Sequence, residues 1–396
     1  MSERSGPLAG LLVVSVEQAV AAPYATRQLA DLGARVIKVE RPGHGDFARH
    51  FDTYANGTGA HFAWVNRNKE SLTLDVKASQ GRAVLDELLD RADVFVHNLV
   101  PGAAPRLGLD GATLLARLPG LVVCEISGYG TGGPYDERKA YDLLIQAEAG
   151  LTTITGSRTE PVKPGIAVAD IAAGMFGFSS VLSALYARER TGAGAALEVS
   201  MLDAMADWMG YPLVVRKHGA EPDLAAGMSH PAIAPYDAYP TADGRLLTVS
   251  VLNDREWAKL ATTVLGRPDM VDDPRFATNQ ARVANRAAID EVVGAVIATL
   301  DVEAAVTALH TAGVGCAVVN RLDEMVDHPQ LSTRDRWVRV AAPHGPVWTP
   351  LAPPVSSAWT TPAGAVPALG QHTDAILAEL GRDAATIRRL HEAGVV

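Results

Sequence analysis

A single aspartate, Asp170, interrupts an otherwise apolar run between Gly165 and Gly177. A carboxylate is seldom buried without a partner, because its removal from water costs several kcal/mol. Aspartate is favoured as an N-cap, and the sequence pattern predicts a helix over 171–190, directly after this residue. A carboxylate at a helix start in an apolar pocket can also act as a nucleophile. The residues alone support the capping role and the nucleophilic role equally.

Other motifs that could carry chemistry are weak or missing. GYGTGG at 128–133 follows a strand pattern, but a dinucleotide-binding loop opens a helix soon after the first strand, so we interpret this motif as a tight loop. The histidines show no HExxH or paired-ligand spacing, and the pattern predicts no metal site. The GxSxG elbow of serine hydrolases does not occur. Cys124 lies in an apolar strand pattern and is interpreted as a core thiol; it and Cys316 are too few and too far apart for a disulfide framework.

The composition narrows the class of protein. The chain has 396 residues, which suggests two domains. Its 35 Lys and Arg against 45 Asp and Glu give a formal charge of −10, which argues against a nucleic-acid binder but allows a local basic pocket for an anionic ligand. We expect no signal peptide and no membrane span, and we interpret the most apolar run, 171–187, as a buried helix. A cytoplasmic location is therefore expected.

The elements that must position these residues alternate between two kinds in the first half of the chain. Strand patterns occur at 11–16, 35–40, 71–76, 94–98 and 121–130, and helical patterns lie between them, for example at 23–32 and 79–93. Such alternation predicts an α/β fold with a doubly wound parallel sheet and helices on both faces.

The pattern changes after about residue 236. Asp243-Gly244 separates two strand-like arms and predicts a hairpin, and helices are expected at 254–265, 281–312 and about 373–392. The predicted layout has a large α/β domain at 1–205 that the C-terminal segment 330–396 completes. A smaller α+β domain spans 225–325, with linkers at 206–224 and 326–340.

Six motifs occur in an order that resembles the class III CoA-transferase family, also called CaiB/BaiF. They are DLGARVIKVERPGHGD (31–46), NRNKESLTLDVKASQG (66–81), VHNLVPGAAPRLGL (96–109), ISGYGTGGPY (126–135), AYDLLIQAEAG (140–150) and VADIAAG (168–174). SHPAIAPYDAYPTADG (229–244) and LGQHT (369–373) are similar to members that move CoA between dicarboxylic acids such as glutarate and mesaconate.

The resemblance implies an enzyme in which Asp170 is the nucleophile. Asp170 would attack an acyl-CoA donor such as succinyl-CoA, pass through a mixed anhydride, and carry CoA as an aspartyl thioester to a small, dicarboxylic acceptor. This chemistry needs no prosthetic group, and coenzyme A enters as substrate. The resemblance also implies an interlocked homodimer.

Contacts with CoA carry over from the same resemblance. The family places backbone contacts after the first strand, nucleotide contacts after later strands, and cationic side chains at the phosphates, which such side chains suit. The corresponding residues are Val20, Ala21, Arg41, Leu74, Lys77, Asn98, Leu99, Val100, Arg106, Lys139 and Tyr141.

Two other functions compete with CoA transfer. Racemases and epimerases of the same family use a His and a Glu beside the Asp, but these positions correspond to Tyr141 and a residue near Asn253, and neither replacement is a good base at neutral pH. Some transferases carry a glycine-rich loop over the site, which SVLND (250–254) lacks. A non-catalytic CoA-binding protein, with Asp170 as a mere cap, is the third alternative.

Overall fold

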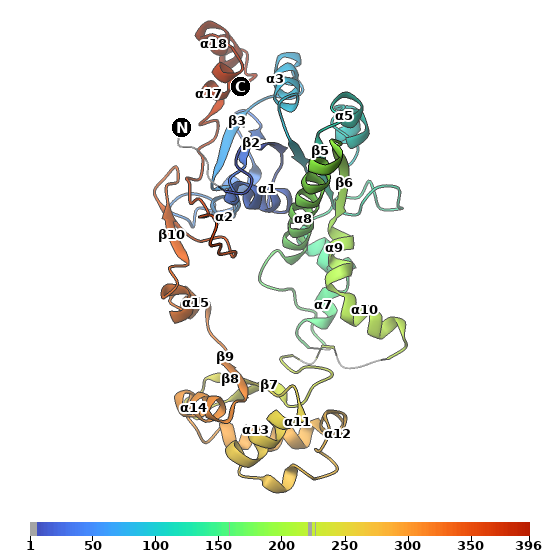
Figure 1. Cartoon of the computed structure of the whole chain (residues 1–396), viewed down its shortest axis with the longest axis vertical. Helices are drawn as coiled ribbons and strands as arrows, with labels where there is room; N and C mark the ends of the chain where they lie inside the picture. Colours follow the sequence, from blue (N-terminus) through green and yellow to red (C-terminus); the bar gives the residue numbers. More distant parts are fainter. Residues whose placement is uncertain (1–5, 158, 221–223, 226) are drawn as a thin grey trace. The chain divides into compact units, whose positions relative to one another are not determined.

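The computed structural model describes residues 6–157, 159–220, 224–225 and 227–396. Contacts within the chain divide it into two compact units (Figure 1). The first comprises Met1–Ala149, Gly165–Gly210 and Gln330–Val396, and the second comprises Gly150–Pro164 and Tyr211–Pro329. Residues 150–164, which the sequence-based layout places in the large domain, group with the second unit.

The first unit is built on a six-stranded sheet in the order β3-β2-β1-β4-β5-β6, in which every neighbouring pair is parallel. The central strands are runs of Val, Ile and Phe that are buried on both faces, as parallel sheets require. The strands are β1 (Leu12–Val16), β2 (Arg35–Glu40), β3 (Lys69–Thr73), β4 (Val94–His97), β5 (Val122–Ser127) and β6 (Ala195–Ser200). The mixed α/β class predicted from the sequence agrees with this architecture. The third strand begins two residues before the predicted 71–76.

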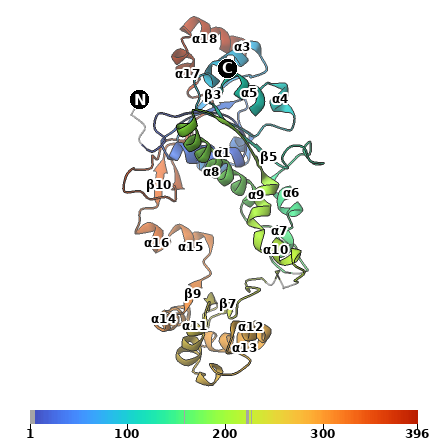
Figure 2. The same cartoon turned by 45° about the vertical axis from the view of Figure 1, so that its right-hand side comes forward.

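Helices cover both faces of the sheet (Figure 2). One face packs against α1 (Ala21–Asp31) and α8 (Val168–Thr191), which contact each other along their length. The opposite face forms one apolar core with helices from the middle and the end of the chain. These are α3 (Ser79–Leu89), α4 (Ala103–Arg106), α5 (Gly111–Arg117), α17 (Thr373–Glu379) and α18 (Ala384–Glu392). The sequence predicts one terminal helix, but Gly381, at φ +84°, separates two.

The long helix α8 lies against the sheet because small residues line its inner side. A Cβ on Gly174 would come within 2.6 Å of the Ala21 carbonyl oxygen, and one on Gly177 within 2.8 Å of the Ile126 side chain. By length and composition α8 could cross a membrane. Helices α13 (Arg286–Ile297) and α14 (Val302–Ala312) pass the same test only together, as one span bent by 119°. Core helices of soluble proteins also pass that test, and 44% of the most apolar window of α8 is buried.

The C-terminal segment covers the free edge of the sheet at β3. The His372 N–H donates to the Ser71 carbonyl at 3.0 Å, and the Thr73 N–H donates to Thr373 Oγ1 at 3.0 Å. An antiparallel hairpin, β10 (Trp337–Val340) and β11 (Val347–Pro350), packs its buried side on Phe62. Since an uncovered edge strand invites pairing with other chains, this return of the chain protects the sheet.

The second unit has its own core around the antiparallel sheet β7-β8-β9. The hairpin predicted at Asp243-Gly244 joins β7 (Tyr236–Pro240) to β8 (Leu246–Ser250), and β9 (Gly315–Val318) pairs with β8. The expected long helix at 281–312 is three helices, since Asn285 ends the first and Asp301 caps the last. The helices are α11 (Asp254–Lys259), η2 (Leu260–Val264), η3 (Pro268–Met270), α12 (Asn279–Ala284), α13 (Arg286–Ile297) and α14 (Val302–Ala312).

Shorter elements complete the chain. They are η1 (Phe47–His50), α2 (Ala60–Asn66), α6 (Asp142–Glu148), α7 (Leu151–Ile154), α9 (Met201–Trp208), α10 (Gly210–Lys217), α15 (Leu322–Val326) and α16 (Pro329–Ser332). Helix α10 and strand β10 lie within the two segments that the sequence suggests as linkers.

Candidate active site

The carboxyl ends of β1 and β4 form the switch point of the sheet. The chain continues from β1 toward β2 on one side and reaches β4 on the other, and ligands of doubly wound sheets bind in the crevice at such a point. Val20 and Ala21 follow β1, and 98–100 follow β4. The two loops are joined, because the Gln18 N–H donates to Asn98 Oδ1 and Asn98 Nδ2 donates to the Gln18 carbonyl, both at 2.9 Å. Val100 lies at this edge and is 68% exposed, whereas Leu99 packs on the core.

Three more predicted CoA contacts follow the carboxyl ends of the neighbouring strands. Arg41 comes directly after β2 and is exposed, and Leu74 and Lys77 come after β3. The Leu74 side chain is buried in the core, so a ligand at this edge could meet only its backbone. Lys77 is exposed, and its N–H donates to Asp75 Oδ1. Parallel strands thus bring segments from four parts of the chain to one edge.

Two cations suited to phosphates lie further along the chain, after β4 and β5. Arg106 is the last residue of α4, and its Nη1 lies over Gly102, where a Cβ would come within 2.8 Å of it. Lys139 is in the exposed segment between β5 and α6. Both side chains are open to an anionic ligand.

Arg106→Ala is expected to raise the KM for every CoA ester by about ten- to a hundredfold, the value of a charge-assisted hydrogen bond. The preference among acceptor acids should hardly change, because the contact is with phosphate. Steady-state kinetics with several CoA esters measure both quantities. Arg388→Ala, which removes an exposed arginine of α18, is the control. An unchanged KM in Arg106→Ala would contradict this assignment.

Asp170 is the third residue of α8 and is partly buried. The N-cap of α8 is Ala167, which offers no capping side chain, so the N-cap role suggested for Asp170 is wrong. The cap comes instead from α6, where Asp142 Oδ1 accepts from the Ala169 N–H at 2.9 Å. Asp170 is therefore not needed to cap the start of α8, and its carboxylate is available for a reaction.

The start of α8 lies next to the start of α1. Gly174, one turn after Asp170, faces the Ala21 carbonyl and the Tyr24 ring. The absent side chain at Gly174 permits this approach, and it brings Asp170 to the same end of the fold as the loop after β1. Tyr141 is the N-cap residue of α6, 62% exposed, directly before Asp142.

The surroundings of Asp170 change its ionisation. Burial is the larger cause and the Asp142 carboxylate the smaller, and they raise the pKa of Asp170 to about 7. An ordinary aspartate, with a pKa of about 3.9, is fully ionised at neutral pH, whereas a group with the pKa of Asp170 is about half ionised at pH 7. A more basic carboxylate is also a better nucleophile.

Asp142→Asn should move the acidic limb of the pH profile of kcat/KM to lower pH. A nucleophilic Asp170 must be ionised, so wild-type activity is expected to fall as the pH drops through about 7. An asparagine keeps an oxygen for the Ala169 N–H but removes the like charge, which lowers the pKa of Asp170. Asp207→Asn, an exposed carboxylate of α9, should leave the limb in place. A limb that stays fixed or moves upward in Asp142→Asn would exclude the electrostatic coupling.

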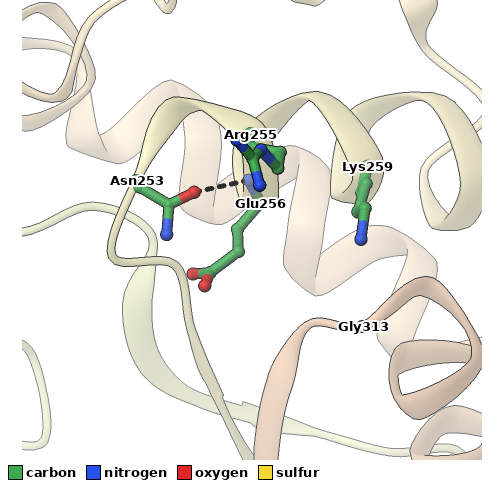
Figure 3. Close-up of a pocket in the computed structure, with 5 residues that line it drawn as sticks. All are labelled: Asn253, Arg255, Glu256, Lys259 and Gly313. Carbon is green, nitrogen blue, oxygen red and sulfur yellow. Dashed lines mark hydrogen bonds between the residues drawn. The ribbon is translucent and has the colours of Figure 1, made fainter.

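The remaining candidates have other roles in the fold. The Cys124 thiol is fully buried in β5, and burial raises its pKa to about 12, in line with a core thiol. GYGTGG forms turns before α6 and opens no helix directly. In the second unit, Asn253 Oδ1 accepts from the Glu256 N–H at 3.0 Å and caps α11 (Figure 3). The hollow beside it, of about 560 Å³, is lined by Asn253, Arg255, Glu256, Lys259 and Gly313.

Sequence reasoning missed Asp142 and Gln18. Asp142 is the only charged residue between Ala140 and Ala147, the same signal that singled out Asp170, but its hydrogen bond crosses 27 positions. Gln18 contributes backbone groups, which leave no mark in a side-chain pattern.

The chain matches the model of CoA-transferase family III over residues 8–373, and it belongs to that family. As a family III enzyme it uses CoA thioesters as substrates.

Particular relatives are similar along nearly the whole chain. It is 35% identical to an acyl-CoA transferase of Fusarium pseudograminearum, covering 100% of this chain and 89% of that protein. It is 33% identical to a succinate–glutarate CoA-transferase of Agrobacterium fabrum, covering 96% and 97%. The solved structure of a CaiB/BaiF family protein from Brucella suis is 34% identical, with a TM-score of 0.82 over 95% of this chain and 100% of that one.

Proposed function

We propose that this enzyme moves CoA from succinyl-CoA or a similar donor to a small dicarboxylic acid, with Asp170 as the covalent carrier. The observation that supports the carrier role is the carboxylate in the first turn of α8, which caps nothing and lies one turn from the contact with α1. The dicarboxylate follows the name of the Agrobacterium relative, whose acids are succinate and glutarate.

The first half of the reaction transfers CoA to the protein. An Asp170 oxygen attacks the thioester carbonyl of the donor, the C–S bond breaks, and a mixed anhydride and the CoA thiolate form. The thiolate then attacks the Asp170 carbonyl carbon of the anhydride. The donor leaves as a carboxylate, and Asp170 holds CoA as a thioester.

The second half runs the same steps in reverse with another acid. The acceptor carboxylate attacks the aspartyl thioester, releases the CoA thiolate and forms a second anhydride. The thiolate attacks the acceptor carbonyl, which gives the new acyl-CoA and restores the Asp170 carboxylate. One thioester is exchanged for another, no proton is consumed, and neither a base nor an oxidant is required.

The structure weakens the racemase alternative. Proton transfer needs a second base beside Asp170, but Tyr141 holds the N-cap position of α6 and Asn253 caps α11. Tyrosine and asparagine side chains are generally poor bases near neutral pH. A non-catalytic binder has no use for a carboxylate with a pKa raised to about 7.

A single assay separates the three functions. The enzyme is incubated with succinyl-CoA and isotope-labelled glutarate, and the CoA esters are separated by chromatography. Labelled glutaryl-CoA supports transfer. Solvent deuterium in the α-position of a branched acyl-CoA supports racemisation, and binding of CoA without either reaction supports the third function. A panel of acids, including one dicarboxylate supplied as its own half-thioester, then identifies the acceptor and distinguishes intermolecular from intramolecular transfer.

We also propose that the active form is a homodimer. The first unit alone exposes large apolar side chains, among them Tyr186 of α8 at 69% and Trp348 of β11 at 66%. Exposed aromatic groups of this size are common at protein interfaces. Light scattering after size-exclusion chromatography should give twice the chain mass of 41.7 kDa; a mass of one chain in the active fraction would exclude the dimer.

A further inference from the structure

Four buried charged residues cluster at the loop that joins β1 to α1, and one of them, Glu17, belongs to the loop itself. Glu17 is 2% exposed, Lys38 0%, Asp46 1% and Lys69 3%. Lys69 Nζ donates to Glu17 Oε1 at 2.7 Å, and Lys38 Nζ donates to Asp46 Oδ2 at 2.8 Å. Burial alone would lower the pKa of Lys38, but Asp46 and Glu17 outweigh it and raise that pKa. Burying charged side chains costs free energy, and apolar side chains could hold the same strands together. We therefore expect the charged cluster to have a specific role.

The cluster forms hydrogen bonds with the backbone of the loop at two points, the Glu17 carbonyl oxygen and the Ala19 N–H. Lys38 Nζ donates to the Glu17 carbonyl oxygen at 3.2 Å. Asp46 Oδ1 accepts from the Ala19 N–H at 3.1 Å and from the Ala48 N–H at 2.9 Å. Asp46 therefore uses one oxygen for the loop and the other for Lys38.

Ala19, whose N–H binds Asp46, has a backbone conformation that is unfavourable for alanine. Ala19 has φ +63°, in the left-handed region where a Cβ is unfavourable. On its other side the loop is fixed by the paired hydrogen bonds between Gln18 and Asn98. A non-glycine residue in this region persists only where surrounding contacts over-determine it, and it often marks a functional site.

The residues directly after Ala19 are the predicted CoA contacts. Val20 is the N-cap of α1, and Ala21 is its first residue. A turn at Ala19 sets the direction in which their backbone groups point, and α1 begins at the switch point of the sheet.

We propose that Asp46, held by Lys38, is a positioning residue that fixes the left-handed turn at Ala19 and so presents the backbone of Val20 and Ala21 to CoA. This role deepens the proposed function, on which the site of CoA rests. Asp46 itself need not touch the ligand.

Asp46→Asn tests the role through the affinity for free CoA, measured by calorimetry. An amide has one oxygen, so it can serve Ala19 or Lys38 but not both. The Kd for CoA should rise about ten- to a hundredfold, the value of a charge-assisted hydrogen bond, and in turnover KM should rise more than kcat falls. Adding Ala19→Gly to Asp46→Asn should recover most of the lost affinity, because glycine adopts the left-handed turn without cost.

Asp31→Asn is the matched control. Asp31 is equally buried, at 1%, and pairs with Arg67 at 2.7 Å at the far end of α1. Its loss should lower the melting temperature without changing the Kd for CoA. If Asp46→Asn leaves the Kd unchanged, weakens it no more than Asp31→Asn does, or is not rescued by Ala19→Gly, the positioning role is wrong.

Ala19→Val decides the matter if Asp46→Asn does not fold. Valine leaves the buried charges intact but strongly disfavours the left-handed region, so the Kd for CoA should rise as it does in Asp46→Asn. Wild-type affinity in Ala19→Val would overturn the inference. Because the measured quantity is CoA binding, failure of the proposed transfer reaction would appear separately, as wild-type enzyme that binds CoA and forms no new ester.

Discussion

Replacing Asp170 by alanine is expected to lower the rate of CoA transfer by about a thousandfold or more, the range seen when a covalent nucleophile is removed. The methyl group cannot form the anhydride or the thioester, and the neighbouring Asp142 is engaged by the Ala169 N–H and by Gln146 Nε2. CoA binding should persist, because the predicted contacts lie on other loops. Time-course assays of CoA transfer measure the loss of rate, and calorimetry with CoA measures binding. Asp170→Asn, which keeps the shape of the side chain, should be equally inactive.

The same variants should be at least as stable as the wild type at neutral pH. An aspartate whose native pKa of about 7 lies above its unfolded value of about 3.9 destabilises the native state once the pH exceeds the unfolded value. The gain in melting temperature of Asp170→Ala should therefore grow from about pH 4 to about pH 7 and then level off. Turnover within tenfold of the wild type would exclude Asp170 as the nucleophile, and loss of folding at pH 7 would indicate a structural role.

Local patterns predicted five of the six strands of the sheet, and β6 (Ala195–Ser200) was missed. Strands buried in a parallel sheet are rich in apolar residues, and β2 at 35–40 was found with its observed bounds although it also contains Lys38. The third strand was predicted too late, because its first residues, Lys69 and Glu70, are charged. Their burial depends on partners from distant segments, Glu17 for Lys69 and Arg35 for Glu70. Propensity cannot anticipate such pairs.

Boundaries of helices failed for a related reason. The pattern at 281–312 is periodic throughout, but Asp301 accepts from the Ala304 N–H and starts a new helix within it. Capping of α8 was one of the two roles that the residues supported equally for Asp170, yet the capping oxygen belongs to Asp142. Asparagine and aspartate are good caps wherever the chain brings them to a helix start, and only the tertiary structure decides which one does so.

In the candidate site, too, some features could be predicted from the sequence and others depend on tertiary contacts. Asp170 stands out in sequence because it is the one charge in an apolar run, and the resemblance of six motifs assigns its role. The raised pKa, the partner Asp142 and the turn at Ala19 arise from segments that meet only in space. Sequence points to the candidate nucleophile, whereas its raised pKa and the shape of the loop after β1 are properties of the fold.

Donor without acceptor should leave CoA covalently attached to the protein. If Asp170 passes through an anhydride to a thioester, intact-protein mass spectrometry after incubation with succinyl-CoA should show a mass increase of one CoA per chain. Hydroxylamine cleaves thioesters and should remove the adduct. Proteolysis should place it on the peptide that contains GIAVADIAAGMFG, residues 165–177. Adding the acceptor acid should discharge it as a new acyl-CoA at a rate no slower than turnover.

The pH dependence of the adduct tests the mechanism more deeply than its presence does. Attack on the donor requires ionised Asp170, so the initial rate of labelling should rise through about pH 7 in the wild type and at lower pH in Asp142→Asn. Asp170→Asn should give no adduct at any pH. Cys124 and Cys316 are the natural competitors for CoA, but burial raises the pKa of both thiols and keeps them unreactive. An adduct on either cysteine, or demonstrable turnover with no adduct at all, would rule out an aspartyl-CoA intermediate.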